Sequence, residues 1–65
     1  RATMQQVLEL LREVLKYDKI EENWAYVRKG LDWSGDAFYH TATTCAYLHL
    51  IAKSPKRWTR ITREG

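Results

Sequence analysis

The sequence predicts a mainly helical protein with one small β-hairpin at its end. Three segments have apolar residues at helical spacing, and a polar Ser-Gly-Asp turn separates the second segment from the third. Two short β-branched and aromatic segments then flank a proline turn near the end of the chain. Three helices followed by a hairpin is the element order of a winged helix-turn-helix. We therefore expect a single winged-helix domain over residues 1–65.

The first helix is expected over residues 3–17. Thr3 and Gln6 have the spacing of a capping box, which favours a helix start at this point. The following apolar residues recur at helical spacing and predict one buried stripe, with Leu10 at its edge: Met4, Val7, Leu8, Leu11, Val14 and Leu15.

The second helix is expected over residues 19–29. Glu21 and Glu22 suit a helix N-terminus, where the macrodipole favours negative charge, and Gly30 occupies the position of a left-handed cap. The apolar residues of this segment share one face: Ile20, Trp24, Val27 and Leu31.

The third helix is expected over residues 36–48, with Ser34 or Asp36 as its N-cap. Small residues predominate on the side predicted to be buried, which comprises Phe38, Thr41, Ala42, Cys45 and either Leu48 or His49. The opposite side carries Tyr39, His40, Thr43, Thr44 and Tyr47. It contains no Lys or Glu, although long charged residues are the usual choice for the exposed face of a helix.

The hairpin is expected over residues 49–62. "HLIAK" and "RWTRIT" predict its two strands, and Ser54-Pro55-Lys56-Arg57 predicts the turn, with proline at a favoured position. Residues 1–36 contain six Lys or Arg and seven Asp or Glu, whereas residues 37–65 contain five Lys or Arg and one acid, Glu64. The basic face therefore belongs to the C-terminal half of the chain.

Length and composition restrict the kind of protein. A chain of 65 residues holds one thin core, and the single Cys45 excludes an internal disulfide framework and any zinc site built on paired cysteines. The cysteine usage predicts a reducing compartment, and no apolar run is long enough to span a membrane. We therefore expect an intracellular protein with no membrane contact. Because the chain starts at Arg1, we also expect it to be a module of something longer.

The winged-helix arrangement predicts how such a domain contacts double-stranded DNA. The third helix of this fold enters the major groove, and the wing carries cations to the flanking phosphates. Hydroxyl, imidazole and phenol groups can hydrogen-bond to base edges or phosphates, which selects His40, Thr43, Thr44 and Tyr47 on the third helix. The hairpin supplies the cations and one half-exposed indole: Lys53, Lys56, Arg57, Arg60 and Arg63, with Trp58.

The end of the chain, "AYLHLIAKSPKRWTRITREG", resembles the winged-helix domain at the N-terminus of Mrr-type restriction endonucleases and related restriction and regulatory proteins. The residues that match are Tyr47, Leu48, Ile51, Ser54, Pro55, Arg57, Trp58, Ile61, Thr62 and Gly65. His49 stands where that pattern has Ala-Gly, and the glycine usual in its wing tip is missing between Arg57 and Trp58. The resemblance implies a DNA-binding module that targets or regulates a larger protein, with any catalysis in a separate domain.

Three alternative functions remain open. Pro55 and Trp58 resemble the wing of winged helices that bind left-handed DNA, and Tyr47 is the one candidate for their third-helix residues. The same exposed aromatic and threonine face could instead dock a protein partner or another domain of the chain. Leu10, Tyr17 and Tyr26 would form the interface of a helical dimerisation domain.

The remaining residues point to packing rather than to chemistry. Trp24 is expected to pack and Trp33 to cap the core, while Cys45 is expected to be a small buried hydrophobe. His40 and His49 lack partners at ligand spacing, so we expect no metal site. The sequence contains no glycine-rich phosphate loop, nucleophile elbow or paired carboxylates, so we expect neither enzymatic activity nor a cofactor.

Overall fold

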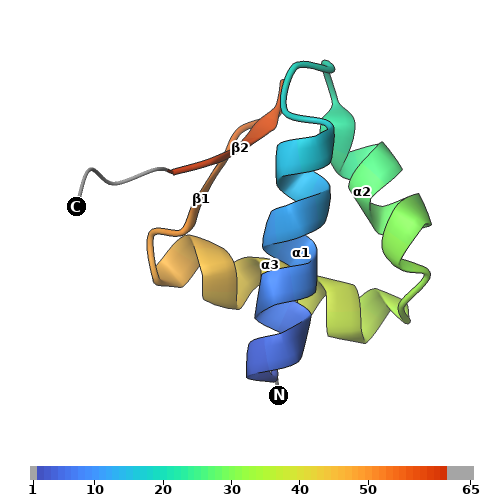
Figure 1. Cartoon of the computed structure of the whole chain (residues 1–65), viewed down its shortest axis with the longest axis vertical. Coiled ribbons are helices and arrows are strands. Elements are labelled where there is room, and N and C mark those ends of the chain that lie inside the picture. Colours follow the sequence, from blue (N-terminus) through green and yellow to red (C-terminus); the bar gives the residue numbers. More distant parts are fainter. Residues whose placement is uncertain (1, 62–65) are drawn as a thin grey trace.

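Three helices precede a two-stranded antiparallel hairpin in a computed structural model that describes residues 2–61 (Figure 1). The elements are α1 (Met4–Lys16), α2 (Asn23–Leu31), α3 (Gly35–Tyr47), β1 (Ile51–Lys53) and β2 (Trp58–Arg60). The predicted fold class is confirmed, because the chain is mainly helical and has a winged-helix-like layout. Within the described residues, no helix is long and apolar enough to cross a membrane.

Helix α1 begins and ends within one residue of the predicted limits. The Thr3 hydroxyl accepts a hydrogen bond from the Gln6 N–H, and the Gln6 side chain accepts one from the Thr3 N–H, so the predicted capping box is present. The predicted stripe is partly wrong, because Leu10 is fully buried rather than at the edge. Helix α1 contacts α2, α3 and β2, and these neighbours cover the Leu10 side while leaving three stripe residues exposed: Met4, Leu8 and Leu15.

The predicted bounds of the second helix, residues 19–29, are wrong. Residues 17–22 form a turn, and Glu22 adopts a left-handed conformation with φ of 54°. The helix continues through Gly30 to Leu31, and Asp32, with φ of 55°, ends it in the left-handed conformation predicted for Gly30. A Cβ at position 30 would lie 2.7 Å from Glu13 Oε1, so Gly30 permits a close approach of α2 to α1.

The start of α2 is fixed by Asn23, a residue that the periodicity did not single out. Its side chain is fully buried and donates hydrogen bonds to the carbonyls of Tyr17 (3.0 Å) and Trp58 (2.7 Å). It also accepts one from the Trp58 N–H at 2.8 Å. A single amide therefore joins the end of α1, the start of α2 and the outer edge of β2.

Helix α3 has its predicted N-cap, since the Ser34 hydroxyl accepts a hydrogen bond from the Ala37 N–H. It buries Thr41, Ala42 and Cys45 as expected. The prediction that Leu48 or His49 completes the buried side is wrong, because both side chains are exposed. His49 instead adopts a left-handed conformation with φ of 62°, and the next N–H bonds back to the Cys45 carbonyl, which ends the helix.

The hairpin pairs Ile51 with Arg60, Ala52 with Thr59 and Lys53 with Trp58. Its paired strands are shorter than the predicted range of residues 49–62, and Thr62 lies outside the described residues, as does the predicted cation Arg63. Ile51 is buried against the helices. The hairpin thus shares the core built around α1, and its tip lies beside the turn between α1 and α2 (Figure 1).

Candidate nucleic-acid interface

The outer face of α3 displays most of the residues predicted to read DNA. Tyr47 is 82% exposed and Tyr39 is 62% exposed, and His40 and Thr43 are also exposed. These four lie opposite the buried side, because successive residues of a helix turn by about 100°. Thr44 is half-buried at the edge of this face, so it is a weaker candidate than Thr43.

His40 lies on the side of α3 that faces the start of α1. It lines a small hollow of about 290 Å³ with Gln6 of α1, Asp36 and Thr41. The Thr41 hydroxyl is buried and has no hydrogen-bond partner in the described structure. The imidazole of His40 packs edge-on against the Tyr39 ring, with 5.7 Å between ring centres.

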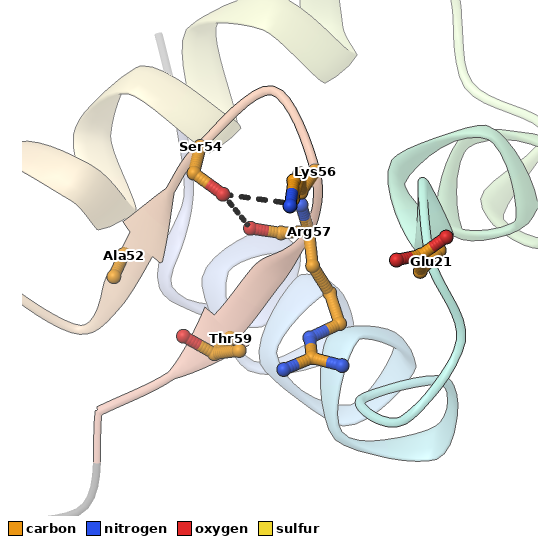
Figure 2. A pocket seen from close by; sticks show the side chains of 6 residues that line it. All are labelled: Glu21, Ala52, Ser54, Lys56, Arg57 and Thr59. Carbon is orange, nitrogen blue, oxygen red and sulfur yellow. Dashed lines mark hydrogen bonds between the residues drawn. The ribbon is translucent and has the colours of Figure 1, made fainter.

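The tip of the hairpin presents Lys56 and Arg57 from a hydrogen-bonded turn. The Ser54 hydroxyl accepts a bond from the Arg57 N–H (3.1 Å) and donates one to the Arg57 carbonyl (2.8 Å). The Arg57 side chain extends away from this turn, and Glu21 stands across an open space from Lys56 (Figure 2). These groups line a hollow of about 430 Å³, and among the described residues Glu21 is the one acid that lines it.

The tip is attached to the helical body. The Glu22 N–H donates to the Lys56 carbonyl at 2.5 Å, and the indole N–H of Trp24 reaches the Pro55 carbonyl at 3.4 Å. Together with the two hydrogen bonds between Asn23 and Trp58, these bonds attach the turn and the first residue of β2 to the start of α2. The backbone that carries Lys56 and Arg57 is therefore positioned by α2.

The other two predicted cations of the described hairpin point elsewhere. Lys53 lies over the Trp58 ring, with 5.3 Å from its ammonium group to the ring centre. Arg60 pairs with the buried Ile51, and paired residues of an antiparallel sheet share one face. Arg60 consequently lines a hollow of about 350 Å³ over α1 that is formed with Leu8, Leu11, Arg12 and Leu15.

The structure therefore separates the predicted contact residues that it describes into groups. His40, Thr43 and Tyr47 share the outer face of α3, with Thr44 at its edge, while Lys56 and Arg57 share the hairpin tip. Arg60 belongs to the surface of α1. Trp58 is half-buried and stacks on Phe38, with ring centres 5.6 Å apart, so its indole connects the hairpin to α3.

The groups with chemical reactivity are few. Cys45 is fully buried, and burial raises the pKa of its thiol because the thiolate would be desolvated. Within residues 2–61, no group of three or more His, Cys, Asp or Glu lies close enough together to hold a metal ion.

The sequence did not identify one further surface, a hollow of about 560 Å³ between α2, the start of α3 and β2. We call it the aromatic hollow, and its lining residues are Trp24, Ala25, Arg28, Lys29, Asp32, Trp33, Phe38 and Trp58. The expectation that Trp24 packs in the interior is wrong, because this side chain is 36% exposed at the edge of the hollow. Trp33 is half-buried and packs against the core, as expected.

The fold and these surfaces define the class of protein as a winged-helix-like domain with a polar third-helix face and a cationic hairpin tip. Comparison with protein-family models, with curated proteins and with solved structures found no match to this chain.

Proposed function

We propose that this chain is a double-stranded DNA-binding domain that targets or regulates a larger protein. In this proposal the outer face of α3 enters the major groove, and Lys56 and Arg57 of the hairpin contact phosphates. The observation that carries the proposal is the uncharged, hydrogen-bonding surface of His40, Thr43 and Tyr47 on the third helix. Uncharged groups of this kind can hydrogen-bond to base edges, where the DNA sequence is read. Cations, in contrast, are attracted to phosphates whatever the sequence.

The distribution of charge supports the same orientation. After Asp36, residues 37–61 contain no acid and four cations: Lys53, Lys56, Arg57 and Arg60. The excess of positive charge in these residues therefore lies on the hairpin, and Lys56 and Arg57 carry it at the tip that a duplex would meet. Cations on a positioned hairpin stabilise a phosphate contact by releasing condensed counterions, which makes the affinity dependent on salt.

The experiment is a fluorescence-anisotropy titration of a labelled duplex at several salt concentrations. Changing both Lys56→Ala and Arg57→Ala should weaken binding to all duplexes nearly equally and lower the slope of log K against log salt by about 1 to 2 units. Both side chains are exposed, so the melting temperature should stay unchanged.

A matched control removes the same charge elsewhere. Arg12 of α1 and Lys29 near the end of α2 are exposed cations outside the proposed interface, and the double change Arg12→Ala and Lys29→Ala should leave the salt slope near its parent value. Equal slopes for the parent and the Lys56 and Arg57 variant would contradict a hairpin contact with DNA. A domain that binds no duplex at low salt would contradict the function itself and favour contact with a protein.

A further inference from the structure

All three tryptophans of the chain line the aromatic hollow. Trp24 comes from α2, Trp33 from the turn before α3, and Trp58 from β2, so three separate segments of the chain meet there. Phe38 of α3 completes the aromatic lining by stacking on Trp58. A domain of this size has little apolar surface to spare for its core, so this much aromatic surface left partly open indicates a binding function.

The cations around the hollow give it a charge. The Arg28 guanidinium lies 5.9 Å from the centre of the Phe38 ring, and the Lys53 ammonium lies over Trp58. Lys29 also lines the hollow, and Asp32 is the one acid of residues 2–61 that does so. None of these three cations forms an ion pair with a described residue, since the one ion pair there joins Lys16 to Glu13. The rim therefore carries cations that are available to an acidic partner.

The arrangement of the rings favours a protein over a nucleic acid as that partner. A base stacks on an open ring face, but Phe38 is contacted by Trp58 and Arg28, and Trp58 is contacted by Phe38 and Lys53. Neither ring is an open stacking platform. Aromatic residues and arginine are instead enriched at the centre of protein interfaces, and polar and charged residues surround that centre at the rim.

We propose that the aromatic hollow docks a protein segment that presents an apolar anchor side chain flanked by acidic residues. The anchor enters between Trp24, Ala25 and Trp33, and the flanking carboxylates pair with Arg28, Lys29 and Lys53. Trp58, which lines this hollow, and Lys53, which lies over the Trp58 ring, are also predicted to contact DNA, but the α3 outer face and the hairpin tip are not part of the hollow. The domain thus has room for a protein segment while its proposed DNA-binding residues stay free.

The test begins with a selection from a random peptide display library on the immobilised domain, without a bias in composition. Enriched peptides should contain an apolar anchor next to Asp or Glu, and their synthetic forms should change the tryptophan fluorescence, because every tryptophan lines the hollow. Rising salt should weaken them, since their acidic residues meet exposed cations.

Two variants locate the binding site. Ala25 is exposed on α2, and Ala25→Glu places bulk and negative charge in the hollow, so it should weaken the selected peptide by about tenfold or more. Lys29→Glu should weaken the peptide by about threefold to tenfold, whereas the matched change Lys19→Glu on the neighbouring turn should have little effect. Thermal unfolding of each variant confirms that the fold is retained.

Several results would overturn the proposal. These are a selection that enriches no peptide, enriched peptides without acidic residues, and selected peptides that bind the Ala25→Glu and parent domains equally well. A single-stranded oligonucleotide that displaces the selected peptide, with a loss of its own binding in Ala25→Glu, would assign the hollow to nucleic acid instead. The Ala25→Glu domain should still bind a duplex with the affinity of the parent. A failure of the peptide experiments can therefore be distinguished from a failure of the proposed DNA-binding function.

Discussion

The core side of α1 and the outer face of α3 differ in what determines their residues. Leu10 and Val14 on α1 are fully buried and touch the other elements, so their shapes are set by the fold. Thr43 and Tyr47 on α3 contribute nothing to the core. Their identities are therefore free of packing requirements, and under the proposed function they are available for recognition.

The Asn23 junction lies between these extremes. It is polar, as the α3 face is, but it is fully buried and its hydrogen bonds are satisfied by the protein itself. Asn23 thus has a structural role because its partners are internal, whereas the polar face of α3 has a recognition role only under the proposed function. Substitutions test this contrast, and the effect on stability should fall from α1 to Asn23 to the surface.

The largest loss of stability is expected for Leu10→Ala. Removing this fully buried side chain should cost about 2 to 5 kcal/mol through lost burial and the cavity left behind. Leu8→Ala is the matched control on the same helix, and it should cost less than about 1 kcal/mol because Leu8 is 52% exposed. Urea unfolding followed by circular dichroism measures both values. Equal losses would mean that the two sides of α1 are packed alike.

A smaller but local loss is expected for Asn23→Ala. The change leaves the Tyr17 carbonyl and both backbone groups of Trp58 without their partner, which should cost about 2 to 3 kcal/mol. The hairpin should loosen before the helices do. Hydrogen exchange monitors this directly, since the Trp58 amide should lose its protection while the amides of α1 keep theirs. An unchanged exchange rate at Trp58 would show that Asn23 does not hold the hairpin.

Local signals in the sequence predicted the fold well. The capping box of Thr3 and Gln6, the Ser34 cap and the proline turn at the hairpin tip each depend on neighbouring residues, and each is present. The predicted start of α2 at residue 19 was wrong, because the helix begins at Asn23, which is held by Trp58, 35 residues further along the chain. No periodicity within a helix contains that information.

Only part of the candidate site could be predicted, because local spacing places residues on a helix face but does not show long-range contacts. Helical spacing was sufficient to place His40, Thr43 and Tyr47 on one exposed face. It could not show that Arg60 turns toward α1, because this direction depends on the pairing of Arg60 with the buried Ile51. The aromatic hollow also requires three distant segments to meet, so it was visible only in the folded chain.

A slight gain of stability is expected for Gly30→Ala. Alanine is favoured over glycine inside a helix by about 0.5 to 1 kcal/mol. The new Cβ would lie 2.7 Å from Glu13 Oε1, a buried oxygen without a hydrogen-bond partner in the described residues, so this flexible carboxylate must move. We expect a net gain of about 0.5 kcal/mol in urea unfolding. A larger gain in a Glu13→Ala background would identify the displaced carboxylate as the opposing cost, and a net loss would show that α1 and α2 cannot adjust.

The smallest effect on stability, and the most specific effect on function, is expected for Thr43→Ala. This exposed side chain should contribute less than about 0.5 kcal/mol to folding. If α3 lies in the major groove, its loss should reduce discrimination between a selected and a random duplex by roughly 1 to 3 kcal/mol, with nonspecific affinity nearly unchanged. A phosphate contact would instead lower both affinities together.

Thr44→Ala is the comparison that sharpens this result, because Thr44 is one residue further along and half-buried at the edge of the face. Neighbouring residues of a helix point about 100° apart, so a helix that meets DNA with its outer face should depend on Thr43 more than on Thr44. A larger loss of discrimination in Thr44→Ala than in Thr43→Ala would mean that α3 enters the groove with its His40 and Thr44 side. If neither change alters discrimination, α3 does not read the bases, and the polar face would require a different partner.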